Sequence, residues 1–150
     1  MLKITVIAVG KLKERFWKDA CAEYLKRLGG YARVAVKELP DSTPEQEERL
    51  ILAALGALPQ GTHVTLLDIG GDLVSSEELA ARLDRLALGG TSSVAFVIGG
   101  SDGVTAAVRA RADERISFGR ITLPHNLARV VLLEQLYRSR KISAGEPYHK

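Results

Sequence analysis

The chain has 150 residues, of which 46% are hydrophobic and 26% are charged, and its formal net charge is +3. This balance is typical of globular proteins and excludes a disordered or low-complexity chain, and the length predicts one domain over residues 1–150. The single cysteine excludes an intrachain disulfide. No apolar run approaches a membrane span and the start has no cleavage pattern, so we expect a cytoplasmic protein without a membrane partner.

Strand and helix patterns alternate in the first half of the chain. Strands are predicted at residues 3–9, 33–39 and 63–69. Helices are predicted at residues 14–28 and 43–58. Thr43, Pro44 and Gln46 provide an N-cap, a first-turn proline and a capping box for the second helix. We expect Gly70-Gly71 to end the third strand.

The alternation continues in the second half. Ser75 and Glu78 form another capping box, which opens a helix that runs to about Leu88. A strand, a short helix and an extended stretch are predicted at residues 93–98, 104–112 and 116–123. Pro124 then introduces a long helix over about 126–140.

This order predicts an α/β fold, a mainly parallel sheet with helices on both faces. The runs "VTLLDI" and "VAFVI" are continuously apolar, as expected of central strands that are covered on both sides. Ligands bind such sheets at the carboxyl ends of the strands. The candidate binding loops therefore follow Asp68, follow Ile98 and precede Pro124.

The loop in "FVIGGSDG" is glycine-rich and follows a buried strand, and it fits several functions. Gly99-Gly100 could let a ligand approach the backbone, or could make an ordinary tight turn. Neither the dinucleotide fingerprint nor the P-loop motif is present. Ser101 lies in G-x-S-x-G, so a serine hydrolase with Asp113 and His125 is an alternative. The two partners are too close in sequence, and the chain is too short, to favour it.

Other signals concern the histidines and the C-terminal third. His63, His125 and His149 lack metal-ligand spacing, so no metal is expected. Six Lys/Arg against two Glu after residue 119 indicate either a surface for a polyanion or a solvated basic helix face. The last helix has a broad apolar face, which suggests a homodimer. That face comprises Leu127, Val130, Val131, Leu133, Leu136 and Tyr137.

Five motifs together resemble the ribosomal RNA large subunit methyltransferase H family over essentially the whole chain: "ITVIAVGK", "LLDIGG", "VIGGSDG", "TLPHNLARVVLLEQLYR" and "GEPYHK". The resemblance implies an S-adenosyl-L-methionine-dependent SPOUT methyltransferase with a C-terminal trefoil knot. It implies a homodimer that methylates N3 of a pseudouridine in helix 69 of bacterial 23S rRNA, on assembled ribosomes and without a metal. A non-catalytic RNA-binding relative is a second alternative.

The resemblance also implies roles for particular residues, and it gives Ser101 none. The cofactor-binding residues would be Leu67, Asp68, Gly99, Gly100, Gly119, Arg120, Ile121, Thr122, Leu123 and Pro124. The catalytic residues would be His125, Arg138, Tyr148 and His149. The RNA-binding residues would be Arg129, Arg138 and Lys150.

Overall fold

One five-stranded sheet forms the centre of the chain in a computed structural model, which describes residues 1–148. The strand order is β2-β1-β4-β3-β5, and every neighbouring pair is parallel. The strands are β1 (Lys3–Val9), β2 (Arg33–Leu39), β3 (His63–Leu73), β4 (Ser93–Ile98) and β5 (Glu114–Ser117). The predicted parallel α/β sheet is therefore confirmed.

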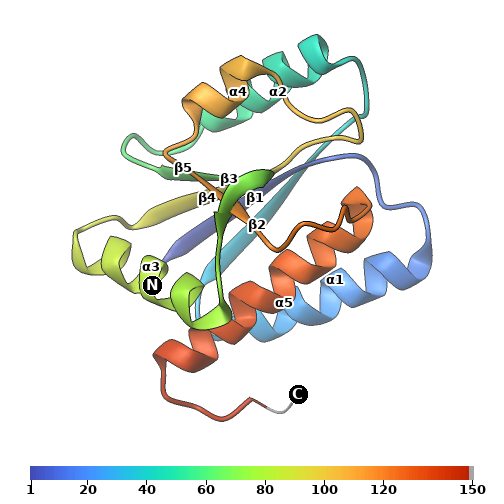
Figure 1. Cartoon of the computed structure of the whole chain (residues 1–150). Coiled ribbons are helices and arrows are strands. Elements are labelled where there is room, and N and C mark those ends of the chain that lie inside the picture. The colour runs from blue at the N-terminus through green and yellow to red at the C-terminus, as the bar shows by residue number, and fades with distance from the viewer. Residues whose placement is uncertain (149–150) are drawn as a thin grey trace.

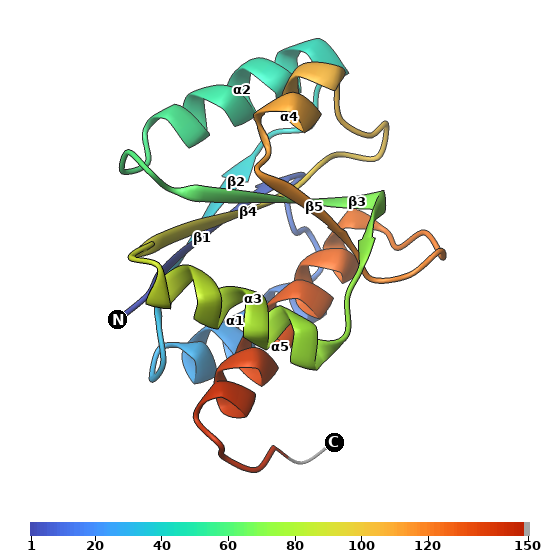
Figure 2. The same cartoon turned by 60° about the vertical axis from the view of Figure 1, so that its left-hand side comes forward.

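Helices cover both faces of the sheet (Figures 1 and 2). One face carries α2 (Pro44–Gly56) and α4 (Ala106–Arg111), and the other carries α1 (Arg15–Leu28), α3 (Ser76–Leu88) and α5 (His125–Ser143). Because β1 and β4 contribute side chains to a core on each face, their sequences are apolar at nearly every position. None of the helices within residues 1–148 is long and apolar enough to cross a membrane.

The helix starts follow the predicted caps. The hydroxyl of Thr43 accepts a hydrogen bond from the Gln46 N–H at 3.3 Å, and Ser75 accepts one from the Glu78 N–H at 3.0 Å. These bonds satisfy backbone donors that a helix start leaves free. Local sequence thus fixes where α2 and α3 begin.

Two predicted boundaries are wrong. Gly70-Gly71 does not end β3, which continues to Leu73, and β5 covers residues 114–117 rather than the extended stretch predicted at 116–123. The cause of both differences is the pairing of β3 with β5, whose register shifts between Leu67 and Asp72. Gly70-Gly71 lies within this irregular segment, and the two strands pair again after it.

Part of the apolar face predicted for a homodimer is used inside the chain. Leu133 and Leu136 of α5 are completely buried, as is Leu132, in the core that α5 shares with α1 and α3. The other predicted members of that face are only half-buried: Leu127, Val130, Val131 and Tyr137.

Candidate active site

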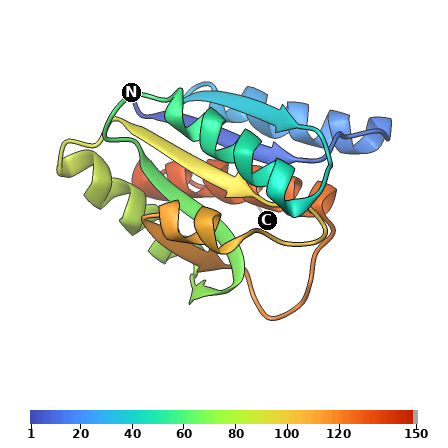
Figure 3. The ribbon, with the colours of Figure 1, turned by 90° about the horizontal axis from the view of Figure 1, so that it is seen from above.

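The glycine-rich loop leaves the sheet at the edge where the parallel strands end (Figure 3). It folds into a turn in which the Gly103 N–H donates to the Gly100 carbonyl oxygen at 3.0 Å. A Cβ atom built on Gly100 would lie 2.8 Å from Oε1 of Glu47, so a side chain at this position would displace that carboxylate. The loop therefore presents bare backbone beside an acidic group.

The predicted third loop, residues 119–124, lies after β5. The Ser117 hydroxyl donates to the Gly119 carbonyl oxygen at 2.9 Å and accepts from the Gly119 N–H at 3.2 Å, which fixes the turn. Beyond it Arg120, Ile121, Thr122 and Pro124 are exposed, and Leu123 is half-buried. Ile121 is 74% exposed, which is unusual for an isoleucine and leaves apolar surface open to a ligand or a partner chain.

Leu67 and Asp68 occupy β3 where its register against β5 shifts. Leu67 packs against the larger core, whereas Asp68 accepts hydrogen bonds from the Gly70 N–H and from Arg115 Nη1, both at 3.0 Å. Burial alone would raise the pKa of Asp68, but these bonds outweigh it and the net effect lowers the pKa. Asp68 is thus a fixed, charged acceptor.

His125 begins α5 and packs on the end of β1. A Cβ atom on Gly10 would lie 2.6 Å from His125 Nε2, and Gly10 has a φ of 105°, a conformation that favours glycine. One helical turn later, Arg129 donates to the Gly10 carbonyl oxygen at 2.7 Å and to Glu38 Oε2 at 2.8 Å. Sequence reasoning missed this cluster; its one signal was the glycine that ends the first strand motif.

This placement changes the role expected of Arg129. Its side chain is 4% exposed, and both of its terminal nitrogens are paired inside the chain. A guanidinium held in this way does not offer its charge to a phosphate. The expectation that Arg129 binds RNA does not fit the structure, in which this residue joins α5 to β1 and β2.

The tail carries a second group of predicted residues. The Arg138 guanidinium is paired with Glu134, with Nη2 and Oε2 2.7 Å apart, and lies 4.4 Å from the centre of the Tyr148 ring. That ring meets Tyr137 edge-on at 5.0 Å. Burial, followed by the nearby Glu134, raises the pKa of Tyr148 to about 12, so its phenol is neutral near pH 7. His149 and Lys150 lie outside the described residues.

The two groups lie at opposite ends of α5. His125 and the three loops are at the strand ends, whereas Arg138 is 13 residues farther along the helix, a distance of about 20 Å. The structure places the Gly99-Gly100 loop and the 119–124 loop at the same edge of the sheet (Figure 3). It does not bring Arg138 or Tyr148 to them within one chain.

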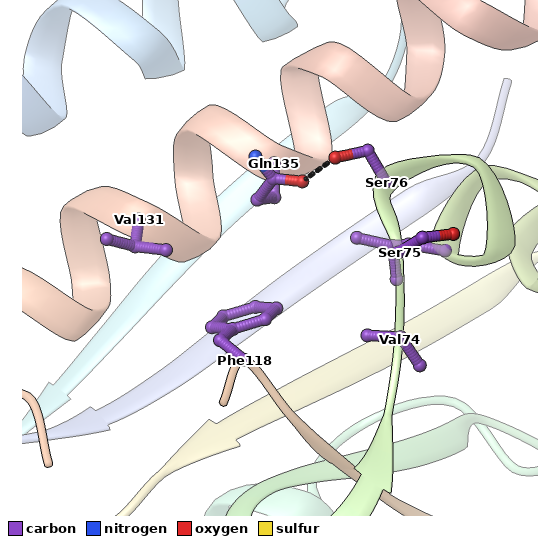
Figure 4. A pocket seen from close by; sticks show the side chains of 7 residues that line it. Val74, Ser75, Ser76, Phe118, Val131 and Gln135 are labelled. Atoms are coloured by element: carbon purple, nitrogen blue, oxygen red, sulfur yellow. Dashed lines mark hydrogen bonds between the residues drawn. The ribbon is translucent and has the colours of Figure 1, made fainter. Parts of the chain in front are cut away.

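Two hollows run along α5 and share Ser76 and Gln135, whose Oγ and Oε1 atoms are 2.6 Å apart (Figure 4). The first, of about 260 Å³, is lined by Val74, Ser75, Ser76, Leu79, Phe118, Val131 and Gln135. The second, of about 510 Å³, is lined by Ser76, Glu77, Gln135, Arg138, Lys141, Ile142, Glu146 and Tyr148. The first hollow is lined by Phe118, which precedes the third loop, and the second by Tyr148 of the tail; neither is lined by Gly99 or Gly100.

The geometry excludes the hydrolase alternative. Ser101 is exposed, and Asp113 accepts the Val64 N–H at 2.8 Å, near the edge where β3 and β5 begin. His125 lies where the strands end, so the three residues do not assemble. Within residues 1–148 no group of three His, Cys, Asp or Glu side chains is arranged to hold a metal ion.

Comparison with known proteins is consistent with the α/β fold. Residues 2–149 match the family model described as "Predicted SPOUT methyltransferase". The chain is 50% identical to the Ribosomal RNA large subunit methyltransferase H of Listeria welshimeri serovar 6b and 52% identical to the protein of that name from Bacillus thuringiensis subsp. konkukian. Each alignment covers 99% of this chain and 100% of the relative. The chain therefore belongs to the SPOUT methyltransferase family.

Proposed function

We propose that the chain transfers a methyl group from S-adenosyl-L-methionine to N3 of a pseudouridine in helix 69 of bacterial 23S rRNA, in the cytoplasm and on assembled ribosomes. The observation that carries this proposal is the end-to-end similarity, at about half identity, to relatives named for methylation of large-subunit rRNA. The alignments with these relatives span the loops and the tail alike.

The residues at the strand ends fit the cofactor. The bare backbone at Gly99-Gly100, the half-buried Leu67 and the exposed 119–124 loop lie at one edge and offer both backbone groups and apolar surface to a nucleoside. When bound, the cofactor would supply the electrophilic methyl group on its sulfonium. The loops would hold that methyl in line with the nucleophilic nitrogen, which lowers the entropic cost of the encounter.

Membership of the SPOUT family supports a trefoil knot in the C-terminal part of the chain. We place the 119–124 loop, which joins the edge strand β5 to α5, in the knotted part of the chain. Threading would hold that loop rigidly against the cofactor.

A homodimer would complete the site. Arg138 and Tyr148 lie about 20 Å along α5 from the loops of their own chain, so we assign them to the site of a second copy. The Tyr148 ring, already stacked against Arg138, would pack on the target base, and Arg138 would stabilise the negative charge that develops as N3 loses its proton. Because Tyr148 is neutral near pH 7, it would donate a hydrogen bond, and His149 is the tail residue suited to accept the proton.

The test is a methylation assay with tritiated S-adenosyl-L-methionine and bacterial ribosomes that lack the modification, followed by mass spectrometry of the labelled nucleotide. Label on N3 of the helix 69 pseudouridine is expected. Label elsewhere would overturn the proposed target, and cofactor binding without any label would indicate a non-catalytic relative. Equal labelling of free rRNA would contradict the requirement for assembled ribosomes.

A further inference from the structure

A buried carboxylate lies beneath the glycine-rich loop. Glu47, in the first part of α2, is 5% exposed and is the only acidic residue classed as buried within residues 1–148. Its Oε2 accepts the Ser42 N–H at 2.8 Å. Within the described part of the chain, no Lys, Arg or His nitrogen lies within 4.0 Å of it.

The carboxylate faces the loop that the proposed function assigns to the cofactor. Its two oxygens lie 2.8 and 3.1 Å from the position that a Cβ atom on Gly100 would take. The start of α2 reaches the edge of the sheet at which β4 ends (Figure 3). No side-chain or backbone donor among residues 1–148 bonds Oε1, the oxygen nearer to that Cβ position.

Oε1 is not among the buried side-chain atoms of the described residues that lack a hydrogen-bond partner, so this oxygen is open to solvent beside the loop. The Ser42 N–H already pairs with the other oxygen. A cation bound at the loop would pair with Oε1. S-Adenosyl-L-methionine carries two cationic groups, the sulfonium and the α-ammonium, and one anionic group, the α-carboxylate, on a neutral adenosine.

We propose that Glu47 is a cofactor-binding residue whose carboxylate faces a cationic group of S-adenosyl-L-methionine at the Gly100 loop. This inference rests on the proposed function, since it takes the cofactor from it. It assigns a role to an acid that the sequence analysis did not single out.

The test is calorimetric binding of three nucleosides to wild-type and variant proteins. S-Adenosyl-L-methionine has both cationic groups, S-adenosylhomocysteine keeps only the ammonium, and 5′-methylthioadenosine has neither. Glu47→Gln removes the charge and nearly keeps the shape of the side chain. Glu47→Asp keeps the charge but moves the carboxylate away from the loop, because the side chain is shorter by one methylene group. Glu45→Gln is the matched control, because Glu45 is exposed in the same helical turn.

We expect Glu47→Gln to weaken the binding of S-adenosyl-L-methionine by about tenfold or more, and the binding of 5′-methylthioadenosine by less than about twofold. If the variant loses as much affinity for S-adenosylhomocysteine as for S-adenosyl-L-methionine, the ammonium is the partner of Glu47. If its affinity for S-adenosylhomocysteine is unchanged, the sulfonium is the partner. If Glu47→Gln does not fold, as judged by circular dichroism, the same selectivity is read from Glu47→Asp. Equal effects on all three nucleosides, or none, would overturn the inference. Failure of the wild-type protein to bind S-adenosyl-L-methionine would instead overturn the proposed function.

Discussion

Arg129 donates a hydrogen bond from Nη2 to the carbonyl oxygen of Gly10 at 2.7 Å, which joins α5 to the end of β1 across 119 residues of sequence. Its Nη1 donates to Glu38 Oε2 at 2.8 Å, and the same oxygen accepts the Leu12 N–H at 3.3 Å. The loop after β1 is thus held by one buried cation and one carboxylate. His125 packs on the same glycine, so this connection also positions the start of α5.

Replacement of Arg129 tests whether it is structural. Arg129→Met keeps much of the side-chain volume but removes the charge, and it leaves Glu38 and the Gly10 carbonyl without their partner. We expect the free energy of unfolding, measured by urea denaturation, to fall by about 3 kcal/mol. Arg120→Met is the control, because Arg120 is exposed and should change stability little. Unchanged stability combined with weaker RNA binding would show that Arg129 contacts RNA after all.

Gly10→Ala should destabilise the protein for two separable reasons. The new Cβ atom would lie 2.6 Å from His125 Nε2, and the φ of 105° would strain any residue with a side chain. Gly61→Ala isolates the strain, because Gly61 has a φ of 86° but no atom within 4 Å of its Cβ position. We expect a loss of about 1–2 kcal/mol for Gly61→Ala and a larger loss for Gly10→Ala.

A double variant then identifies the cause of the difference. Adding His125→Ala to Gly10→Ala removes the imidazole, so the pair should be less destabilised than the sum of the two single changes. Simple additivity in the thermal or urea midpoints would mean that the histidine and the glycine do not interact.

Local chemistry explains why much of the fold could be predicted from sequence. Thr43 and Ser75 cap their helices through bonds to residues three positions away, and a buried parallel strand is apolar whatever its neighbours are. The strand-end rule also predicted candidate binding loops after Ile98 and before Pro124, and both lie at one edge of the sheet (Figure 3), whereas the loop predicted after Asp68 is part of β3. What remained hidden depends on long-range contacts. Gly70-Gly71 looked like a strand end because the pairing partner β5 lies more than forty residues later.

The same limit applies to the charged residues of the site. From the sequence Arg129 was expected to bind RNA and Glu47 was not singled out, because each is buried by segments far away in sequence. Conversely, Arg138 shares the motif "TLPHNLARVVLLEQLYR" with the third cofactor loop in the sequence, yet the length of α5 separates the two within the chain. A family resemblance can assign residues to one site even when they would come together only between two copies of the chain.

Glu114 should make stability depend on pH. The pKa of Glu114 is lowered from 4.5 to about 2. The largest cause is the His63 imidazole, whose Nε2 lies 3.3 Å from Oε1 of Glu114. Burial opposes this effect, and hydrogen bonds from Thr65 and Arg82 add to it. Because the folded-state pKa is depressed, the stabilisation is complete above about pH 4.5 and is lost as the pH falls toward 2. It is worth about 2–3 kcal/mol.

Glu114→Gln removes this titration. Urea denaturation at a series of pH values should give a wild-type advantage that is largest near neutral pH and shrinks in acid. Glu45→Gln, on an exposed residue, should parallel the wild type throughout. A Glu114→Gln variant whose deficit is the same at every pH would show that hydrogen bonding alone, without the charge, accounts for its effect.

Complementation between two inactive variants tests whether the site is shared between chains. Gly100→Ala places a Cβ atom 2.8 Å from Glu47 Oε1 and should disable the loop, whereas Arg138→Met should disable the tail group. Each homodimer should be nearly inactive in the methylation assay. Co-expression would form mixed dimers in which one site takes its loop from the Arg138→Met chain and its tail from the Gly100→Ala chain, so that site is intact.

Random pairing of equal amounts should therefore restore about a quarter of the wild-type rate, because half of the dimers are mixed and each holds one intact site of two. If loop and tail instead act within one chain, every chain in the mixture carries a defect and no activity returns. Separation of the dimers by differently charged tags gives the sharper measurement, since the mixed fraction alone should be active. Activity in neither the mixture nor the purified mixed dimer would contradict a site shared between two chains, because Arg138 and the loops would then have to act within one chain, across the roughly 20 Å that α5 puts between them.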